Sequence, residues 1–510
     1  MSKLNIKHIV ILIALSLGVF WVALFNQFTG DDHVLFEGNA FYTSWGHWPD
    51  LFTQKYSTTS SMGQESKAVY HSGSVAYRPV LSSTYFWDYS LWKLNPFGYH
   101  LDNLLLHTIN TILVYLILIQ ICQDPALALF SACLFCVHPT KVEAVASIGY
   151  RADLLACFWQ LLSLLAFIYY RLRKRKSYFA GCLAFYFLAL FTKESAIIMP
   201  LVFMAYDYYF GELVLKDYAM PIGLTGFYLY VYFFVFPNTS LVHLQYLGGS
   251  FAHHATVIAW IFSRYIIDLI LPFQVMMLPP LYLPPIEPLA LLKLFSGILI
   301  FAALIVAIIK FYKSNKLISF FLFIFLVGFI PIANIIPLAN PMAHRFLYFP
   351  SIGFAALLGL IFMRWQNRLR GVFQVALIGL CIAVTVPLTM RWHSDLSVAR
   401  TLVEYYPENI KGHLILGVQF LKIGQKNQAA VEFQKCLQLG DKDPWIYYLM
   451  GVAVDDKPQE AAMYFQKAIE VAPNVSTPYL ALEQLYKKTG NDQAAQQILK
   501  QARAAGIKDE

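Results

Sequence analysis

The stretch HIVILIALSLGVFWVALFN at residues 8–26, with GDDH at residues 30–33 just after it, decides how the whole chain is read. The first part is long enough to cross a lipid bilayer as a helix. Asp31 and Asp32 therefore lie where the chain leaves the lipid, at the start of an aromatic-rich loop over residues 27–98. Two adjacent carboxylates at such a boundary suggest an active site, provided that other reactive groups gather on the same side.

The composition indicates a membrane protein with several spans. Of the 510 residues, 58% are hydrophobic and 13% are charged, which leaves too few polar groups to cover a water-soluble globule of this size. The net charge of +8 does not indicate a nucleic-acid partner, because the basic residues cluster beside apolar segments, at 171–176, 310–316 and 364–370. Such runs mark the cytoplasmic side of a membrane protein.

The cysteine pattern argues against a disulfide framework. The chain has seven cysteines, of which only Cys436 lies in the polar C-terminal part and the others lie in or beside apolar segments. Their spacing matches no zinc-binding motif. We therefore predict no metal site, and the question of a divalent cofactor stays open.

The apolar segments predict a polytopic domain with about eleven spans. The first segment has Lys3 and Lys7 before it, as a signal peptide would, but no small-residue cleavage site precedes Asn26, so we interpret it as a retained span. Segments of spanning length lie at 8–26, 100–121, 126–146, 153–170, 178–192, 196–213, 217–236, 289–309, 317–338, 347–363 and 372–390.

Charge orients these spans. With the N-terminus inside, alternation puts the basic run 171–176 on the cytoplasmic side. Keeping 310–316 inside then requires the further apolar segment 252–271 to make no net crossing, as an interfacial or re-entrant helix would. The region after Met390 then lies outside. This places the C-terminal part on the non-cytoplasmic side. The short lysine-containing start and the compact C-terminal part suggest an integral protein of a bacterial inner membrane or its equivalent.

A polar part with an internal repeat begins at about Ser394, so we divide the chain into a membrane domain at 1–393 and a repeat domain at 394–510. The repeat is a degenerate tetratricopeptide pattern, which predicts a soluble α-solenoid. A concave surface for a peptide or protein partner is favoured over a stabilising cap, because about three repeats are near the minimum for a stable stack.

Small and aromatic residues define the seam of this repeat. Gly417 and Gly451 align, and each is followed by a phenylalanine, Phe433 or Phe465. Small residues at such positions let paired helices approach closely. The second copy is two residues shorter between its Gly and its Phe, so we expect a tighter turn near residues 455–458.

Polar groups differ between the two predicted faces. The cytoplasmic face has bare Lys/Arg runs and short connections, whereas the outer face mixes acids, bases and histidines with Trp, Tyr and Pro. A single charged residue in a loop does not indicate a site, because loops are commonly charged. The difference between the two faces as a whole favours an active site on the outer face. Residues that we expect to shape it are His107, His138, Glu143, Asp153, Glu194 and His344.

Asp31 and Asp32 are the candidate general bases. A carboxylate at a membrane boundary does such work when desolvation raises its pKa toward the working pH. Adjacent side chains diverge, so one carboxylate can face the reaction while the other holds a loop or a hydroxyl. We favour Asp32 slightly as the base. The alternative, equally good for the dipeptide alone, is a cap for a helix that starts near Val34.

Four cations at the outer ends of spans form a predicted phosphate-binding rim, since a charge at such a place usually has a function and Arg offers phosphate a bidentate fork. Each also has a structural alternative. Lys193 can pair with the adjacent Glu194, Arg151 with Asp153, and Arg345 can anchor the interface with Tyr348. The four cations are Arg78, Arg151, Lys193 and Arg345.

His100, Asn103 and His107 fall on one helical stripe, because their spacings are three and four. A neutral His107 that is hydrogen-bonded to a neighbouring helix is the favoured interpretation. No His-x-x-x-His pair with a nearby acid indicates a metal site.

Several of these motifs together resemble a known family, the transmembrane and tetratricopeptide-repeat containing O-mannosyltransferases. More distantly, the chain looks like protein O-mannosyltransferases and other GT-C glycosyltransferases. The resemblance covers nearly the whole chain. One departure is that family members usually have Gly directly before the Arg-Ala-Asp run, whereas here Tyr150 lies between Gly149 and that run. The motifs are HLDNLLLH (100–107), HPTKVEAV (138–145), YRADLL (150–155), TKES (192–195) and RFLYFPS (345–351).

The resemblance implies a sugar donor linked to polyprenyl phosphate and a transfer on the non-cytoplasmic side. It carries the catalytic role onto Asp31 and Asp32, which would deprotonate a hydroxyl acceptor, most simply a protein Ser or Thr, while the four cations hold the leaving phosphate. Expected partners are this donor, a protein or glycan acceptor, membrane lipid and a peptide bound by the repeats. Alternatives are a ligase for lipid-linked glycans and a non-catalytic scaffold or transporter.

Overall fold

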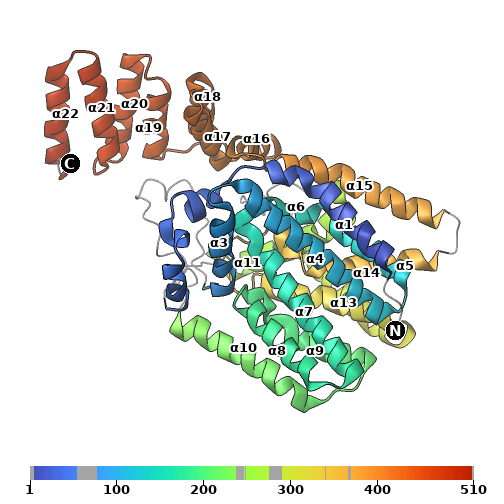
Figure 1. Cartoon of the computed structure of the whole chain (residues 1–510). Coiled ribbons are helices and arrows are strands. Elements are labelled where there is room, and N and C mark those ends of the chain that lie inside the picture. The colour runs from blue at the N-terminus through green and yellow to red at the C-terminus, as the bar shows by residue number, and fades with distance from the viewer. Residues whose placement is uncertain are drawn as a thin grey trace. The chain divides into compact units, whose positions relative to one another are not determined.

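The fold is entirely helical wherever the structure describes the chain (Figure 1). It forms two compact units, Met1–Ser394 and Asp395–Glu510, so the division lies one residue beyond the predicted boundary. The all-α fold class is confirmed for the described ranges. The computed structural model describes residues 5–53, 77–236, 246, 249–274, 290–338, 340–365 and 369–507.

The apolar segments of the first unit form helices. Among the described residues, six helices are long and apolar enough to cross a membrane, and the bent pair Pro125–Val137 and Pro139–Ala146 would make a seventh. The unit is therefore an integral membrane domain, while the count of about eleven spans stays a prediction. The main helices are α1 (Ile6–Phe20), α4 (Pro96–Cys122), α5 (Pro125–Val137), α6 (Val142–Ala146), α7 (Arg151–Arg173), α8 (Lys176–Leu190), α9 (Met199–Phe210), α10 (Ala219–Tyr230), α11 (Phe251–Ile270), α12 (Ala290–Ser314), α13 (Lys316–Phe329), α14 (Pro350–Arg364) and α15 (Arg370–Met390).

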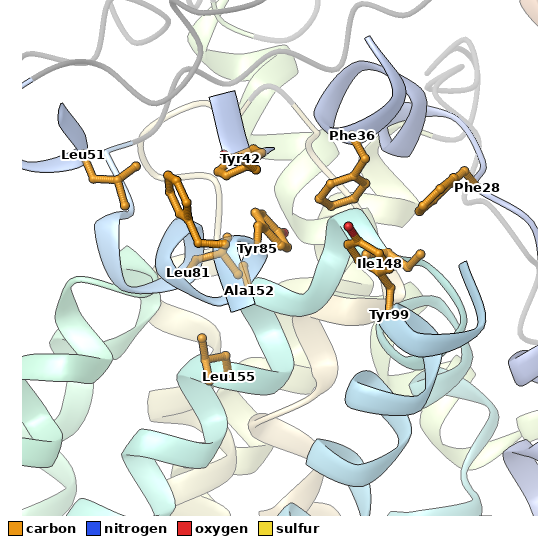
Figure 2. Close-up of a cluster of buried hydrophobic side chains, with 11 residues drawn as sticks. Phe28, Phe36, Tyr42, Leu51, Leu81, Tyr85, Tyr99, Ile148, Ala152 and Leu155 are labelled. Atoms are coloured by element: carbon orange, nitrogen blue, oxygen red, sulfur yellow. The ribbon is translucent and has the colours of Figure 1, made fainter. Parts of the chain in front are cut away.

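An aromatic core holds the loop after the first span. The ring of Phe36 lies 5.0 Å from that of Tyr85 and 4.9 Å from that of Tyr99, measured between centroids. Rings at these distances pack favourably and bury a large apolar area. The cluster fixes the loop against α4 and α7 (Figure 2). Residues 54–76 of the loop lie outside the described residues. The short elements are η2 (His33–Glu37), η3 (Ala40–Thr43), η4 (Trp45–Phe52) and α3 (Pro79–Trp92).

Arg171, in the last turn of α7, is paired with acids rather than bare. Its Nη2 lies 2.5 Å from Oδ2 of Asp207 on α9, and its Nη1 binds Asp217. The hydroxyl of Tyr218 donates another hydrogen bond to Asp207. The prediction of a bare basic run is therefore wrong at this residue. A cation enclosed between helices needs acidic partners to offset its lost hydration.

The second unit is built from helices that pack in consecutive pairs. A Cβ atom on Gly417 of α17 would lie 2.4 Å from Cε1 of Phe433 on α18, and one on Gly451 of α19 would lie 2.4 Å from Cε1 of Phe465 on α20. The Gly–Phe contacts of the predicted seam are therefore present in two successive pairs. The helices are α16 (Asp395–Tyr405), α17 (Ile410–Lys422), α18 (Lys426–Gln438), α19 (Pro444–Ala453), α20 (Pro458–Val471), α21 (Ser476–Lys488) and α22 (Asp492–Ala504).

The shorter second repeat does not have a tighter turn, contrary to our prediction. The turn between α17 and α18 covers residues 423–425, whereas the turn between α19 and α20 covers 454–457 and is one residue longer. The second repeat is shorter because its first helix is shorter: α19 has 10 residues, whereas α17 has 13. Pro458 explains the longer turn, because the residue before a proline is disfavoured in the helical region and Lys457 is indeed non-helical.

Gly451→Ala is expected to destabilise the second unit by about 1–3 kcal/mol, because the added Cβ overlaps the ring of Phe465. Hydrogen exchange of the α19 and α20 amides in the full chain measures this loss. The double change Gly451→Ala/Phe465→Leu is expected to recover part of it. Unchanged exchange in the single variant would show that the two helices do not depend on this contact.

Candidate functional site

Asp31 and Asp32 lie in a closed turn after the first span. Gly30 has a φ of +56°, in the left-handed region that favours glycine, and it lets the chain double back. The N–H of Asp32 then donates to the carbonyl of Thr29, and Oδ2 of Asp32 accepts from the N–H of Thr29, both at 3.1 Å. Oδ1 of Asp32 accepts from the N–H of Gly149 at 2.7 Å. Asp32 thus joins this turn to the segment before α7.

This geometry excludes the helix-capping alternative for Asp32. The side chain of Asp32 makes no capping hydrogen bond to η2, which follows it. The backbone of Asp32 is itself helical, with φ −61° and ψ −34°, whereas a capping residue has an extended backbone. The carboxylate instead bridges two segments that are far apart in the sequence.

Burial separates the two carboxylates. Asp32 is fully buried, whereas Asp31 is partly exposed. Burial raises the pKa of Asp32 from 3.8 to about 7, against the opposing effect of the N–H groups of Thr29 and Gly149. A carboxyl that titrates near neutral pH is typical of catalytic sites.

The raised pKa of Asp32 makes stability depend on pH. Because the folded pKa of about 7 lies above the unfolded value of 3.8, folding takes up a proton between these values. The contribution of Asp32 is therefore fully present below the lower value and is lost as the pH rises through about 7. We expect the unfolding temperature of the unmodified protein to fall across this window more steeply than that of Asp32→Asn. Scanning fluorimetry at constant ionic strength measures both slopes, and equal slopes would contradict a buried, protonatable Asp32.

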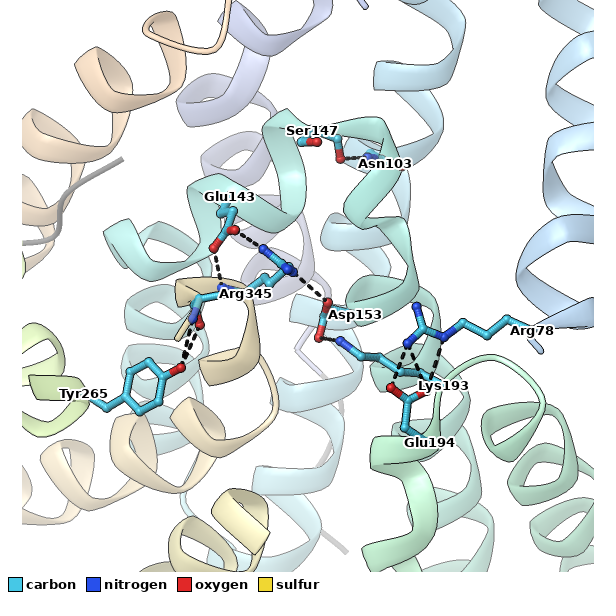
Figure 3. A network of polar contacts seen from close by, with 10 residues as sticks. Arg78, Asn103, Glu143, Ser147, Asp153, Lys193, Glu194, Tyr265 and Arg345 are labelled. Atoms are coloured by element: carbon cyan, nitrogen blue, oxygen red, sulfur yellow. Dashed lines mark hydrogen bonds and ion pairs between the residues drawn. The ribbon is translucent and has the colours of Figure 1, made fainter. Parts of the chain in front are cut away.

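Six charged side chains from separate segments of the membrane unit form a network of ion pairs (Figure 3). Asp153 in the first turn of α7 is its centre, with Oδ1 2.5 Å from Nζ of Lys193 and Oδ2 3.9 Å from Nε of Arg345. Three cations and three acids take part, so their formal charges balance. The members are Arg78, Glu143, Asp153, Lys193, Glu194 and Arg345.

Two further acids complete the network. Glu143 on α6 binds the guanidinium of Arg345 and also accepts the backbone N–H of Arg345 at 2.9 Å. Glu194 accepts from Nη2 of Arg78 at 2.7 Å and from Nε at 3.2 Å. Burial alone would raise the pKa of Glu194, but the charges of Arg78 and Lys193 hold it below its usual value. Burial lowers the pKa of Lys193, against the opposing charge of Asp153.

The simple pairings between sequence neighbours are wrong. Lys193 pairs with Asp153 rather than Glu194, and Arg345 lies over the ring of Tyr150, with Cζ 3.9 Å from its centroid. Partners come from different elements because side chains at adjacent positions diverge. The expected rim of cations is therefore a set of buried ion pairs, as the cost of burying an unpaired charge requires.

Tyr150 brings the carboxylate turn and the charge network together. The N–H of Gly149 donates to Asp32, and the guanidinium of Arg345 lies over the ring of the next residue, Tyr150. A cation above an aromatic face is held electrostatically. Asp32 and Arg345, which are more than 300 residues apart in the sequence, are therefore connected through two consecutive residues.

Arg151 lies apart from this network, contrary to its predicted place in the phosphate rim. Its guanidinium binds Asp88 on α3, and its Nε donates to Oδ1 of Asn103 at 2.6 Å. Its Nη2 donates to the carbonyl of Tyr99 at 3.1 Å. All three of its nitrogens are used inside the protein, so Arg151 holds α3, α4 and α7 together. The predicted pairing with Asp153 is also wrong.

The histidines have structural contacts. Both ring nitrogens of His107 are used, by the Tyr348 hydroxyl at 2.6 Å and by the carbonyl of Cys136 on α5 at 3.1 Å, which confirms the predicted bond to a neighbouring helix. His138 contacts Oγ1 of Thr140 and the carbonyl of Leu269. Both residues therefore connect separate segments of the membrane unit through their ring nitrogens.

Two buried charged residues, Asp268 and Lys141, were not predicted as site residues. Asp268 on α11 lies 3.0 Å from Nε2 of His344, and its other oxygen lies 2.9 Å from Nε of Arg264. Lys141 is fully buried, donates to the hydroxyl of Ser351 and has no acidic partner among the described residues. Both could have been identified from the sequence as charged residues within apolar stretches. In the described part of the chain, no cluster of His, Cys, Asp or Glu has the make-up of a metal site.

Fold and site together define a multi-helix integral membrane protein with a buried charge network and a helical C-terminal unit. The chain is similar to protein O-mannosyl-transferase F38B6.6 of Caenorhabditis elegans, with 24% identity over 430 residues, which are 81% of this chain and 60% of that protein. It is also similar to protein O-mannosyl-transferase TMTC1 of Homo sapiens, with 43% identity over 96 residues, or 19% of this chain and 10% of that protein. Similarity to protein O-mannosyl-transferase TMTC3 of Homo sapiens is 26% identity over 167 residues, which are 33% of this chain and 17% of that protein.

These comparisons confirm the resemblance to transmembrane and tetratricopeptide-repeat containing O-mannosyltransferases. The chain spans 60% of the length of the C. elegans relative and at most 17% of the human ones named above. No family model matches the chain.

Proposed function

We propose that this protein is a membrane glycosyltransferase of the GT-C type. It moves a sugar from a polyprenyl-phosphate donor to a hydroxyl group, of a serine or threonine in a protein, on the non-cytoplasmic face. The observation that carries the proposal is the connection of a carboxylate turn to a preformed charge network through Gly149 and Tyr150. The names of the relatives, protein O-mannosyl-transferases, support the same chemistry.

The reaction is a displacement at the anomeric carbon with inversion. The acceptor oxygen forms the new bond, the bond from the anomeric carbon to the phosphate oxygen breaks, and its electron pair leaves with the polyprenyl phosphate. The acceptor proton passes to a carboxylate. A water-poor site with fixed dipoles and charges lowers the barrier, because its groups need not reorganise during the reaction.

We assign the two carboxylates different roles. Asp32 is fully buried and both of its oxygens already accept backbone N–H groups, which supports a role in positioning the segment at Gly149. Asp31 is partly exposed, which supports contact with the acceptor. We therefore take Asp31 as the base, in place of the initial preference for Asp32. Ionisation of Asp32 near pH 7 then adds a neighbouring negative charge that makes Asp31 more basic.

The leaving phosphate is assigned to Lys193, Arg345 and Arg78. Within the described residues, Nη1 of Arg78 and Nη2 of Arg345 make no hydrogen bond, so each guanidinium keeps donors for a phosphate oxygen. Lys193 is held by Asp153 and supplies a point charge. The acids keep the cations in place while the site is empty. The second unit is assigned to binding a peptide or protein through its helix pairs.

The test uses the full chain in liposomes, supplied with a synthetic mannosyl polyprenyl phosphate and a peptide that contains Ser and Thr. We expect a mass increase of one hexose on the peptide and none on a matched peptide with Ala in place of Ser and Thr. Transfer only from an oligosaccharide linked through a diphosphate would favour the ligase. The absence of transfer from either donor would contradict the enzyme and favour a scaffold or transporter.

A further inference from the structure

The loop elements η4 and α3 expose an unusually apolar face. Trp87 and Leu91 lie one turn apart on α3 and are 61% and 65% exposed, and Leu94 just beyond the helix is 46% exposed. Trp45 and Phe52 on η4 are 42% and 44% exposed. An exposed group of large apolar side chains marks a surface that contacts something other than water. We call these five residues the aromatic face.

The two elements present one continuous surface. The ring centroids of Trp45 and Trp87 are 5.1 Å apart in an edge-to-face contact. Nε1 of Trp45 donates to Oγ of Ser90 on α3 at 2.8 Å, and Nε1 of Trp48 donates to Oγ of Ser83 at 3.0 Å. Because these indole N–H groups are satisfied within the protein, the rings of Trp45 and Trp48 can enter an apolar medium without leaving a donor unpaired.

The surface continues onto a membrane-spanning helix. α4 begins at Pro96, directly after α3, and is one of the candidate spans. Its residues Phe97, Leu105 and Ile109 are separated by multiples of four and so share one side, and they are 40%, 44% and 44% exposed. The apolar surface of α3 therefore joins the outward side of a span.

We propose that the aromatic face lies in the phospholipid bilayer, at the boundary between headgroups and acyl chains. Its continuity with the span α4 and the internally bonded indole N–H of Trp45 favour lipid over a protein partner. Tryptophan is enriched at this depth of a membrane. The proposal does not depend on the enzymatic activity. If the proposed function also holds, lipid contact fixes the membrane depth of Arg78, which immediately precedes α3, at the level of a lipid-linked phosphate.

The test is tryptophan fluorescence of the full chain in nanodiscs of phosphatidylcholine brominated near the headgroup or near the chain end. We expect Trp87→Phe to remove part of the bromine-quenched emission, and more of it with bromine near the headgroup. Leu91→Trp, which adds a reporter, is expected to add quenched emission. Trp445→Phe in the second unit is the matched control and is expected to leave the bromine-quenched emission unchanged.

Acrylamide, a water-soluble quencher, separates the remaining outcomes. If acrylamide rather than brominated lipid quenches the emission lost in Trp87→Phe and gained in Leu91→Trp, the face contacts water and the proposal is overturned. If neither quencher reaches these positions, a protein surface covers the face and the proposal is equally overturned. These outcomes leave the transfer assay unaffected, so failure here is distinguishable from failure of the proposed function.

Discussion

Asp31→Asn is expected to lower the turnover number for sugar transfer by about 10²- to 10⁴-fold, the usual contribution of a general base. The amide has the shape of the carboxylate but cannot accept the proton of the acceptor hydroxyl. The fold should survive, because Asp31 is partly exposed and the turn is closed by Thr29, Asp32 and Gly149. Turnover at saturating donor and acceptor measures the effect, and the Michaelis constant for the donor should change little.

Asp32→Asn and Asp50→Asn serve as comparisons for this variant. Asp32→Asn removes the group that titrates near pH 7, so we expect it to flatten the rise of activity through that pH while some turnover remains. Asp50 lies on η4, where it pairs with His47 and not with any member of the charge network, so Asp50→Asn should have little effect. If Asp31→Asn turned over donor at nearly the normal rate while Asp32→Asn did not, the two roles would be reversed.

Arg345→Met is expected to abolish most transfer and also to destabilise the protein. The loss of a guanidinium from a preorganised site costs about 10²- to 10³-fold in rate. Glu143 would then be buried without its partner, which costs about 3–5 kcal/mol of stability. Initial rates and the unfolding temperature in the same detergent measure the two effects.

A second substitution separates stability from catalysis. In Arg345→Met/Glu143→Leu neither charge of the pair remains, and such replacements are often neutral or stabilising. We therefore expect the double variant to regain the unfolding temperature but not the activity. Recovery of both would mean that Arg345 has only a structural role and does not bind the leaving phosphate.

Much of the fold could be predicted from local patterns. The apolar segments became helices because their length and composition leave few alternatives in a bilayer. The Gly and Phe spacing identified the contacts of Gly417 and Gly451. The prediction of a tighter turn near residues 455–458 is wrong because a difference in length does not say which part of a helix pair is shorter. Pro458 favours a longer turn, since it disfavours a helical backbone at Lys457.

The candidate site could be predicted only in part. Placing the polar residues on one face singled out Lys193 and Arg345 and also the acids Asp153 and Glu143, but not which of them pair. Pairing depends on which helices are neighbours, so Arg151 binds Asp88 rather than Asp153. The role of Tyr150 depends on the approach of a residue from a distant segment, and nothing in its local sequence could predict it.

The most direct test of the proposed centre is a structure of the full chain with a non-hydrolysable sugar phosphonate on a polyprenyl chain. We expect the phosphonate oxygens within hydrogen-bond distance of Arg345 or Lys193, and the anomeric carbon on the side of Asp31. A phosphonate bound elsewhere, with the ion pairs of Arg345 and Lys193 unchanged, would contradict the assignment of this network to sugar transfer.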